Sequence, residues 1–191
     1  YDADNQVIVD SAESVAGLQW LIDGFSGGYI PKESLEWKEE DGRNAFEKGD
    51  LLFYRQWPYQ YANNKKSLGP DKFDVAALPS IDGKPFVSTL GGHNCAIAKG
   101  SKNKATALKF LKWWTNEDSQ RYALKTQALA PIYGSLYDDP ELLKDFPYLP
   151  TLKKSLENAK SRPQAVYYGD VTAKIQDNIY PAIQQPGSRS A

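Results

Sequence analysis

The segment 51–61 constrains the fold of this 191-residue chain more than any other stretch. Its first part, Leu51–Tyr54, is a short apolar run bounded by turn residues, which favours a buried strand. A polar turn with Trp57 and Pro58 follows, and proline suits the first turn of a helix because that position needs no backbone donor. Here a strand leads directly into a helix, and the same alternation of helices with a few strands along the chain predicts an α/β fold.

Helical and strand-like patterns alternate along the rest of the chain. Apolar residues spaced by three and four predict a helix over 11–26, with Ser11 or Asp10 as its cap. We expect further helices at 41–48, after Pro58, and at 107–114, 116–125, 141–146, 152–159 and 166–183. We expect strands at 51–54, 73–79, 86–89 and 94–98, which together would form a central sheet flanked by helices.

The overall charge excludes two classes of function. Lys and Arg number 23 and Asp and Glu number 24, so the net charge is −1. A nucleic-acid surface would need a basic excess, and a polybasic membrane contact would need one too. The 12 Tyr and 5 Trp residues raise the aromatic share to 13%, enough to serve both a core and a binding surface.

Groups for catalysis and metal binding are scarce. His93 is the only His and Cys95 the only Cys, so the usual Cys/His zinc clusters cannot form. We expect Cys95 to be a small buried residue beside an ordinary His93. The chain has no nucleophile elbow and no phosphate-binding Gly-rich loop, and no carboxylate pair stands out. We therefore predict no catalytic centre, no metal site and no cofactor.

Candidate binding groups gather where strands are expected to end, which is where α/β folds place ligand groups. Trp57 offers an apolar ring face and a donor at its rim. The Gly91-Gly92 pair leaves the backbone open to a ligand, although a bulge or a tight bend would explain the pair equally well. These features predict a site for a neutral, hydroxyl-rich small molecule.

Two other aromatic clusters favour packing as much as binding. Trp113 and Trp114 are adjacent in a predicted helix and point about 100° apart, so we expect one in the core and one partly exposed. Arg162 precedes Tyr167 and Tyr168, which either line a site or pack as two ordinary tyrosines in a loop.

Four stretches, taken in order, resemble one protein family: Asn44–Asp50, Phe73–Pro79, Ser88–Ile97 and Ala107–Gln120. Together they are similar to the C-terminal half of bacterial extracellular solute-binding proteins, in the carbohydrate-binding group that includes the maltose- and trehalose-binding proteins of ABC importers. The resemblance implies two α/β lobes joined by a hinge, with a periplasmic-binding-protein-like fold. Residues 1–185 would supply most of one lobe, with strands that cross back to the second lobe, and 186–191 a flexible tail.

The resemblance also implies a function and a location. The protein would be the capture component of an ABC importer, would bind a mono- or oligosaccharide, and would be no enzyme. Its partners would be the sugar, the membrane permease and the N-terminal half of the same protein, which we expect to be missing because the chain begins at Tyr1 and contains no Met. It would be an extracellular or periplasmic lipoprotein, anchored through that absent N-terminal segment.

Site residues follow from the resemblance by position. Trp57 would be the aromatic platform and His93, where the family often has Trp, would line the cleft. The full set of expected ligand-binding residues is Trp57, Tyr59, Gly91, Gly92, His93, Arg162 and Tyr168. Three alternatives stay open: a glycoside-active enzyme, a sugar-independent protein-interaction module, and a binder of peptides, polyamines or metal within the same superfamily.

Overall fold

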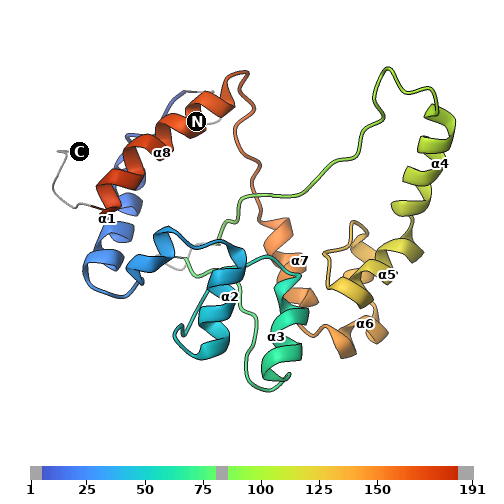
Figure 1. The fold of residues 1–191 in the computed structure, drawn as a ribbon, viewed down its shortest axis with the longest axis horizontal. Coiled ribbons are helices and arrows are strands. Elements are labelled where there is room, and N and C mark those ends of the chain that lie inside the picture. Colours follow the sequence, from blue (N-terminus) through green and yellow to red (C-terminus); the bar gives the residue numbers. More distant parts are fainter. Residues whose placement is uncertain (1–5, 81–85, 185–191) are drawn as a thin grey trace. The chain divides into compact units, whose positions relative to one another are not determined.

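The computed structural model describes residues 6–80 and 86–184, and these are mainly helical (Figure 1). Two of the shorter elements are the 3₁₀ turns η1 (Lys32–Leu35) and η3 (Gly134–Tyr137). The α-helices are α1 (Ala12–Ser26), α2 (Glu39–Lys48), α3 (Gln60–Leu68), α4 (Lys104–Trp114), α5 (Glu117–Gln127), α6 (Pro140–Asp145), α7 (Leu149–Glu157) and α8 (Tyr168–Gln184).

The predicted central sheet is not seen in the described residues. The segments 51–54, 73–79 and 94–98 run without strand pairing there, and 86–89 contributes only one isolated parallel bridge, between Thr89 and Lys160. In that bridge Lys160 N–H donates to the carbonyl of Ser88 (2.9 Å) and Leu90 N–H donates to the carbonyl of Lys160 (2.8 Å). A strand is stabilised by hydrogen bonds to a neighbouring strand, and the described chain places no such neighbour beside these segments.

The chain divides into two compact units. The first contains the described residues up to Lys38 and those from Pro163 onward. Its helices α1 and α8 lie side by side (Figure 1). Ser11 caps α1 by accepting a hydrogen bond from Ser14 N–H (3.2 Å), which confirms the predicted helix and its cap.

The second unit, residues 39–162, contains the core of the molecule. Its most deeply buried side chains are leucines of α5, η3, α6 and α7, namely Leu124, Leu136, Leu142 and Leu149. Tyr61 of α3 joins them, with its ring centroid 4.4 Å from that of Tyr148 and 5.3 Å from that of Phe73. Elements from residues 117–157 thus enclose this core together with α3 and Phe73 from an earlier part of the chain, and we call it the leucine core.

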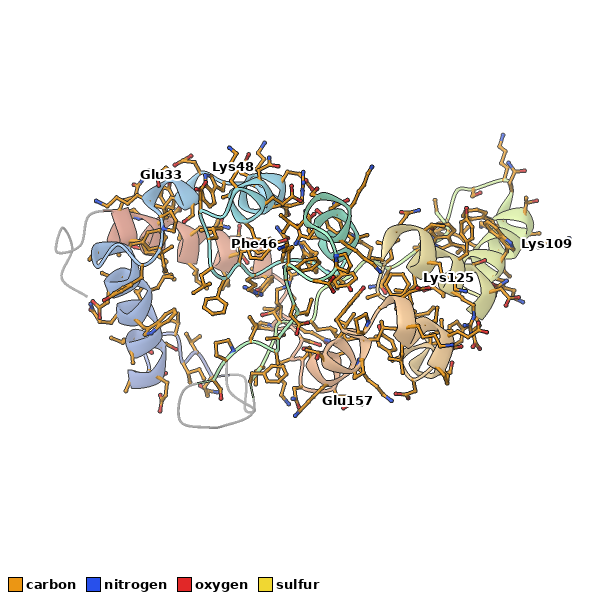
Figure 2. The ribbon with its side chains drawn as sticks, turned by 90° about the horizontal axis from the view of Figure 1, so that it is seen from below. Glu33, Phe46, Lys48, Lys109, Lys125 and Glu157 are labelled. Carbon is orange, nitrogen blue, oxygen red and sulfur yellow. The ribbon has the colours of Figure 1, made fainter. Side chains whose placement is uncertain are left out.

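Helix α2 packs on α3 and begins at Glu39, two residues before the predicted start. The acidic residues of its first turn favour an earlier start because carboxylates stabilise the positive end of a helix. Figure 2 shows Phe46 turned inward and Lys48 outward. The Phe46 ring lies 4.5 Å from that of Tyr54, so the extended chain at 51–54 is held against α2.

Helix α4 differs from the prediction. Trp113 and Trp114 are both exposed, so the expectation that one of them lies in the core is wrong. Together with Phe110 they form a cluster of rings with centroids 5.8–6.3 Å apart, which we call the α4 aromatic patch. The physical reason is that α4 has no buried residue in the described structure and makes its helix contacts mainly with α5.

Candidate ligand-binding site

Trp57 lies in the turn that starts α3. The backbone N–H of Gln60 donates to the carbonyl of Trp57 (3.1 Å), and that of Tyr61 donates to the carbonyl of Pro58 (3.0 Å). Pro58 therefore lies in the turn just before α3, whose N-cap is Tyr59, and not at the first helical position that the sequence predicted. The Trp57 side chain is 50% exposed, so part of its ring remains open to a ligand.

Gly91 lies directly against the Trp57 ring. A Cβ atom added at Gly91 would be 2.7 Å from Cη2 of Trp57, closer than nonbonded carbon atoms approach in proteins. Only glycine allows the backbone to come this near to the indole. Gly92 has φ of +145°, a conformation that other residues avoid. The structure therefore brings the predicted aromatic residue and the predicted glycine pair together.

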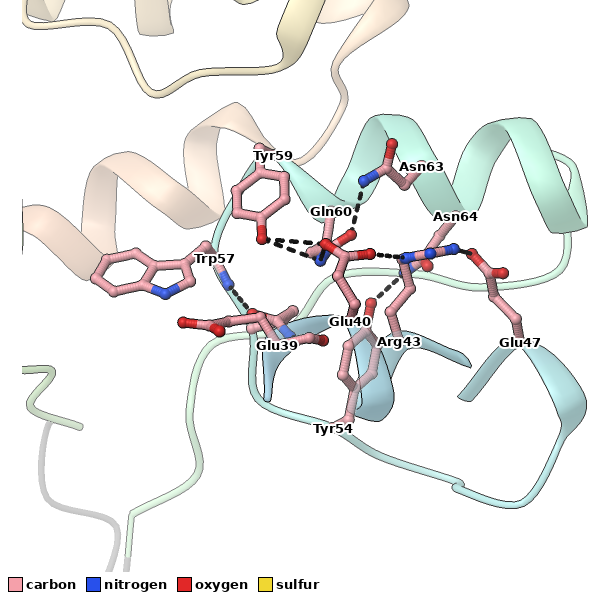
Figure 3. Close-up of polar contacts among 11 residues, drawn as sticks. Glu39, Glu40, Arg43, Glu47, Tyr54, Trp57, Tyr59, Gln60, Asn63 and Asn64 are labelled. Carbon is pink, nitrogen blue, oxygen red and sulfur yellow. Dashed lines mark hydrogen bonds and ion pairs between the residues drawn. The ribbon is translucent and has the colours of Figure 1, made fainter. Parts of the chain in front are cut away.

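Gln56 ties the turn before Trp57 to the first residue of α2. Its Nε2 donates to the carbonyl of Glu39 (2.8 Å), and its Oε1 accepts from the Trp57 N–H (3.0 Å). Figure 3 shows Glu39 and Trp57, the two residues that this bridge joins. The backbone on the N-terminal side of Trp57 is thus held to α2 through both ends of one amide.

Glu40 ties the turn after Trp57 to α2. Its carboxylate accepts hydrogen bonds from Gln60 Nε2 (2.9 Å) and Tyr59 Oη (3.4 Å), and from Arg43 Nε (2.7 Å). The Arg43 guanidinium, followed by the Gln60 amide, holds the pKa of the Glu40 carboxyl below its ordinary value. Burial and the nearby Glu40 charge raise the pKa of Tyr59, so at neutral pH this cluster combines a carboxylate with a protonated phenol.

Polar groups continue from Gln60 into the interval between α2 and α3. Asn63 Nδ2 donates to Gln60 Oε1 (2.8 Å), and Asn64 Nδ2 donates to the hydroxyl of Tyr54 (Figure 3). Burial raises the pKa of the Tyr54 hydroxyl, which is therefore protonated at neutral pH. This network fixes the side of α3 that faces α2.

The remaining predicted residues fall in different places. His93 follows Gly92 in an exposed stretch, and Cys95 is also exposed, so the expectation of a buried Cys95 is wrong. The stretch lacks a neighbouring strand in the described structure, and without one it cannot enclose the thiol. Arg162 is exposed in the second unit, whereas Tyr168 is half-buried and begins α8 in the first unit.

Sequence reasoning missed Glu40, Arg43 and Gln60. By sequence alone, the acidic run at the start of α2 is typical of a helix N-terminus, and Gln60 is typical of a surface residue of a helix. The signal that could have pointed to them is a glutamine placed one residue after the Trp57–Tyr59 turn. Its side chain is only 1% exposed and would need partners.

One hollow of the described structure lies apart from the predicted site residues. A hollow of about 470 Å³ is lined by Tyr61, Phe73, Pro147 and the turn 70–74, and includes none of the predicted site residues. Across residues 6–80 and 86–184, no three His, Cys, Asp or Glu side chains are grouped to hold a metal ion. Within the same residues, none of the helices combines the length and the apolar character that crossing a bilayer requires.

The comparison with known families decides what kind of protein this is. Residues 1–160 match the family described as bacterial extracellular solute-binding protein. The chain belongs to this family. The matched range contains the Trp57 turn, the Gly91-Gly92 pair and the α2–α3 network.

Two curated relatives agree with this solute-binding protein in sequence. One is a "Probable ABC transporter-binding protein" of Deinococcus radiodurans, 31% identical over 184 residues, which span 94% of this chain and 44% of the relative. The other is a "Maltotriose-binding protein" of Pyrococcus abyssi, 25% identical over an alignment of 208 positions that includes gaps and covers 89% of this chain and 46% of the relative. The chain therefore spans about half the length of the curated relatives it matches.

A solved structure agrees in fold. The maltose-bound MalE3 of T. maritima matches with a TM-score of 0.88 and 32% identity, over 96% of this chain and 48% of that chain. This likeness supports a periplasmic-binding-protein-like fold for the solute-binding protein, while the sheet of that prediction is not seen in the part of the chain that the structure describes.

Proposed function

We propose that this chain forms part of the substrate-capture component of an ABC importer and binds a mono- or oligosaccharide without changing it. The observation that carries the proposal is the half-exposed Trp57 ring set against the bare backbone of Gly91, in a member of the solute-binding family. The name of one relative, an ABC transporter-binding protein, supports the importer, and the name of the other, a maltotriose-binding protein, supports a sugar as the solute.

The proposed chemistry is stacking combined with hydrogen bonding. The C–H face of a sugar ring packs on the indole of Trp57, as apolar surface packs on aromatic rings in general. Sugar hydroxyls bond to backbone groups of Gly91 and Gly92 and to polar side chains nearby. We keep Tyr59, His93, Arg162 and Tyr168 as the proposed source of those side-chain contacts.

The proposed mechanism is capture by closure. Two lobes close about a hinge over the sugar, and the permease recognises the closed form. The sugar favours that form only if it binds the closed state more tightly than the open one. We further propose that a lipid-modified N-terminal segment anchors the protein outside the cell membrane, and that the half of the fold beyond this chain supplies the opposite wall of the cleft.

The 191-residue chain should therefore bind sugar more weakly than a version extended by that remaining half. NMR titration with maltose, maltotriose and trehalose measures such weak binding directly. Trp57→Ala should lower the affinity about tenfold or more, which corresponds to about 1.4 kcal/mol. Trp113→Ala is the matched control, because it removes a similarly exposed indole from α4.

Gly91→Ala tests the same site from its other side. The new methyl group would collide with the Trp57 ring and push it away. Gly91→Ala should therefore lower the sugar affinity as Trp57→Ala does, whereas Trp113→Ala should leave it unchanged. Equal losses in Trp57→Ala and Trp113→Ala would remove the proposed site. If the purified chain hydrolysed chromogenic glycosides, the proposed capture function would be wrong and an enzymatic function would take its place.

A further inference from the structure

Hydrogen bonds join the first turn of α2 to the chain on both sides of Trp57 (Figure 3). On the N-terminal side, Gln56 links the Glu39 carbonyl to the Trp57 N–H. On the C-terminal side, the Glu40 carboxylate accepts from Tyr59 and Gln60. We call this pair of links the α2 clamp. A turn that is held at both ends has little freedom to rotate.

Gln60 makes the second link of the α2 clamp depend on the Glu40 carboxylate. Its amide is 1% exposed, and a buried amide that loses a hydrogen-bond partner destabilises the fold. Its Nε2 donates to Glu40 Oε1 (2.9 Å) and lies 3.2 Å from Tyr59 Oη, while its Oε1 accepts from Asn63 (2.8 Å). The position of the helix start therefore follows the position of the Glu40 carboxylate.

Arg43 fixes that carboxylate in turn. Its Nε pairs with Glu40 Oε2 (2.7 Å), and its Nη1 pairs with Glu47 Oε1 (2.9 Å), so the guanidinium is held from two sides. The two oxygens of Glu40 thus have different tasks, one toward Arg43 and one toward the turn at Tyr59 and Gln60.

We propose that Glu40 is a positioning residue for Trp57. Held by Arg43, its carboxylate fixes the turn in which the Trp57 ring meets Gly91, and so sets the ring face that the ligand uses. The effect on sugar affinity rests on the proposed function above, whereas the effect on the Trp57 ring itself does not. A tie that only stabilised the packing of α2 on α3 would leave the ring where it is.

The first measurement follows the ring without any ligand. The indole N–H resonance of Trp57 is assigned in an ¹H–¹⁵N spectrum by its loss in Trp57→Phe. Glu40→Ala should move or broaden this resonance, while Glu47→Ala, the matched control that also removes a carboxylate from Arg43, should leave it in place. If Glu40→Ala does not fold, as judged by its circular dichroism, Glu40→Gln replaces it, since the amide keeps the shape but has only one acceptor oxygen and cannot accept from both Arg43 and Gln60.

The second measurement is a double-mutant cycle on maltotriose affinity. Glu40→Ala should weaken binding about tenfold in the wild-type background and leave the affinity unchanged in Trp57→Ala, because coupled residues are not additive. Additive losses in the cycle would overturn the proposal. So would an unmoved indole resonance, or one that moves equally in Glu47→Ala. If the unmutated chain binds none of the three sugars, the proposed function fails and the indole resonance alone decides the role of Glu40.

Discussion

The leucine core and the α4 aromatic patch lie in the same unit and use the same kinds of side chain, yet they are buried to opposite extents. Leu124, Leu136, Leu142 and Leu149 are 0% exposed. On α4, Leu108 is 47%, Phe110 55% and Trp113 58% exposed. The leucine core is enclosed because α5, η3, α6 and α7 are covered by Tyr61 of α3 and by Phe73, which come from an earlier part of the chain. The difference shows that an apolar face is buried only when a second surface covers it.

Exposed apolar patches of this kind commonly mark interaction surfaces. The chain spans about half the length of its matched relatives. We therefore expect the proposed remaining half of the fold to cover the α4 aromatic patch. The contrast between the two regions leads to four predictions, whose expected effects decrease from the first to the last.

The sharpest contrast comes from the same substitution in both regions. Leu142→Ala should lower the free energy of unfolding by about 2–5 kcal/mol, because it opens a cavity in a closed core. Leu108→Ala, its matched control on α4, should change it by about 0.5 kcal/mol or less. Urea unfolding followed by circular dichroism measures both. Similar losses would show that α4 is packed in solution.

Two buried tyrosines separate hydrogen bonding from packing within the leucine core. The Tyr137 hydroxyl donates to the carbonyl of Pro131 (2.7 Å), whereas the buried Tyr148 hydroxyl has no hydrogen-bond partner among the described residues. Tyr137→Phe should therefore destabilise the fold by about 1–2 kcal/mol, and Tyr148→Phe should leave its stability unchanged or raise it. The same unfolding experiment checks the pair, and the reverse order would contradict the observed hydrogen bonding.

Asp139 makes one edge of the leucine core sensitive to acid. It caps α6 by accepting from the N–H groups of Glu141 (2.8 Å) and Leu142 (3.2 Å), and it pairs with Arg121 (2.6 Å). Arg121 first, then the cap, lowers the pKa of the Asp139 carboxyl. The contribution of Asp139 to the free energy of unfolding is therefore complete above the ordinary aspartate pKa of about 3.9, and it is lost as the pH falls through the lowered pKa.

Asp139→Asn should retain the cap at neutral pH and lose part of this acid dependence. Thermal unfolding measured between about pH 2 and pH 7 should then give a shallower decline of the melting temperature below about pH 4 than in the unmutated chain. Identical declines would show that the Arg121 pair does not form in solution.

Trp113→Ser should have the smallest effect on stability, within about 0.5 kcal/mol, because the ring is exposed. It should nevertheless lower the binding of an apolar dye such as ANS, since it removes part of the α4 aromatic patch. In a version of the protein that includes the remaining half, the same substitution should become destabilising. An unchanged stability there would mean that the remaining half does not cover Trp113.

The sequence alone determined the helices and much of their capping. The cap at Ser11 and the start of the helix after Pro58 were readable because the groups that satisfy them lie within three residues along the chain. The pairing of an aromatic residue with a bare glycine backbone was also visible as a proposal, since Trp57 and the Gly91-Gly92 pair stand out by residue type alone.

Only the tertiary structure decided the features that need distant partners. The segments 51–54 and 94–98 were strand-like in sequence and remain unpaired in the described chain, and Trp113, Trp114 and Cys95 proved exposed. The link from Glu40 to Gln60 likewise joins residues of different helices. Helix caps and apolar periodicity depend on residues that are neighbours in the sequence. Burial and strand pairing depend on which distant segment packs against a given one, and no single segment contains that information.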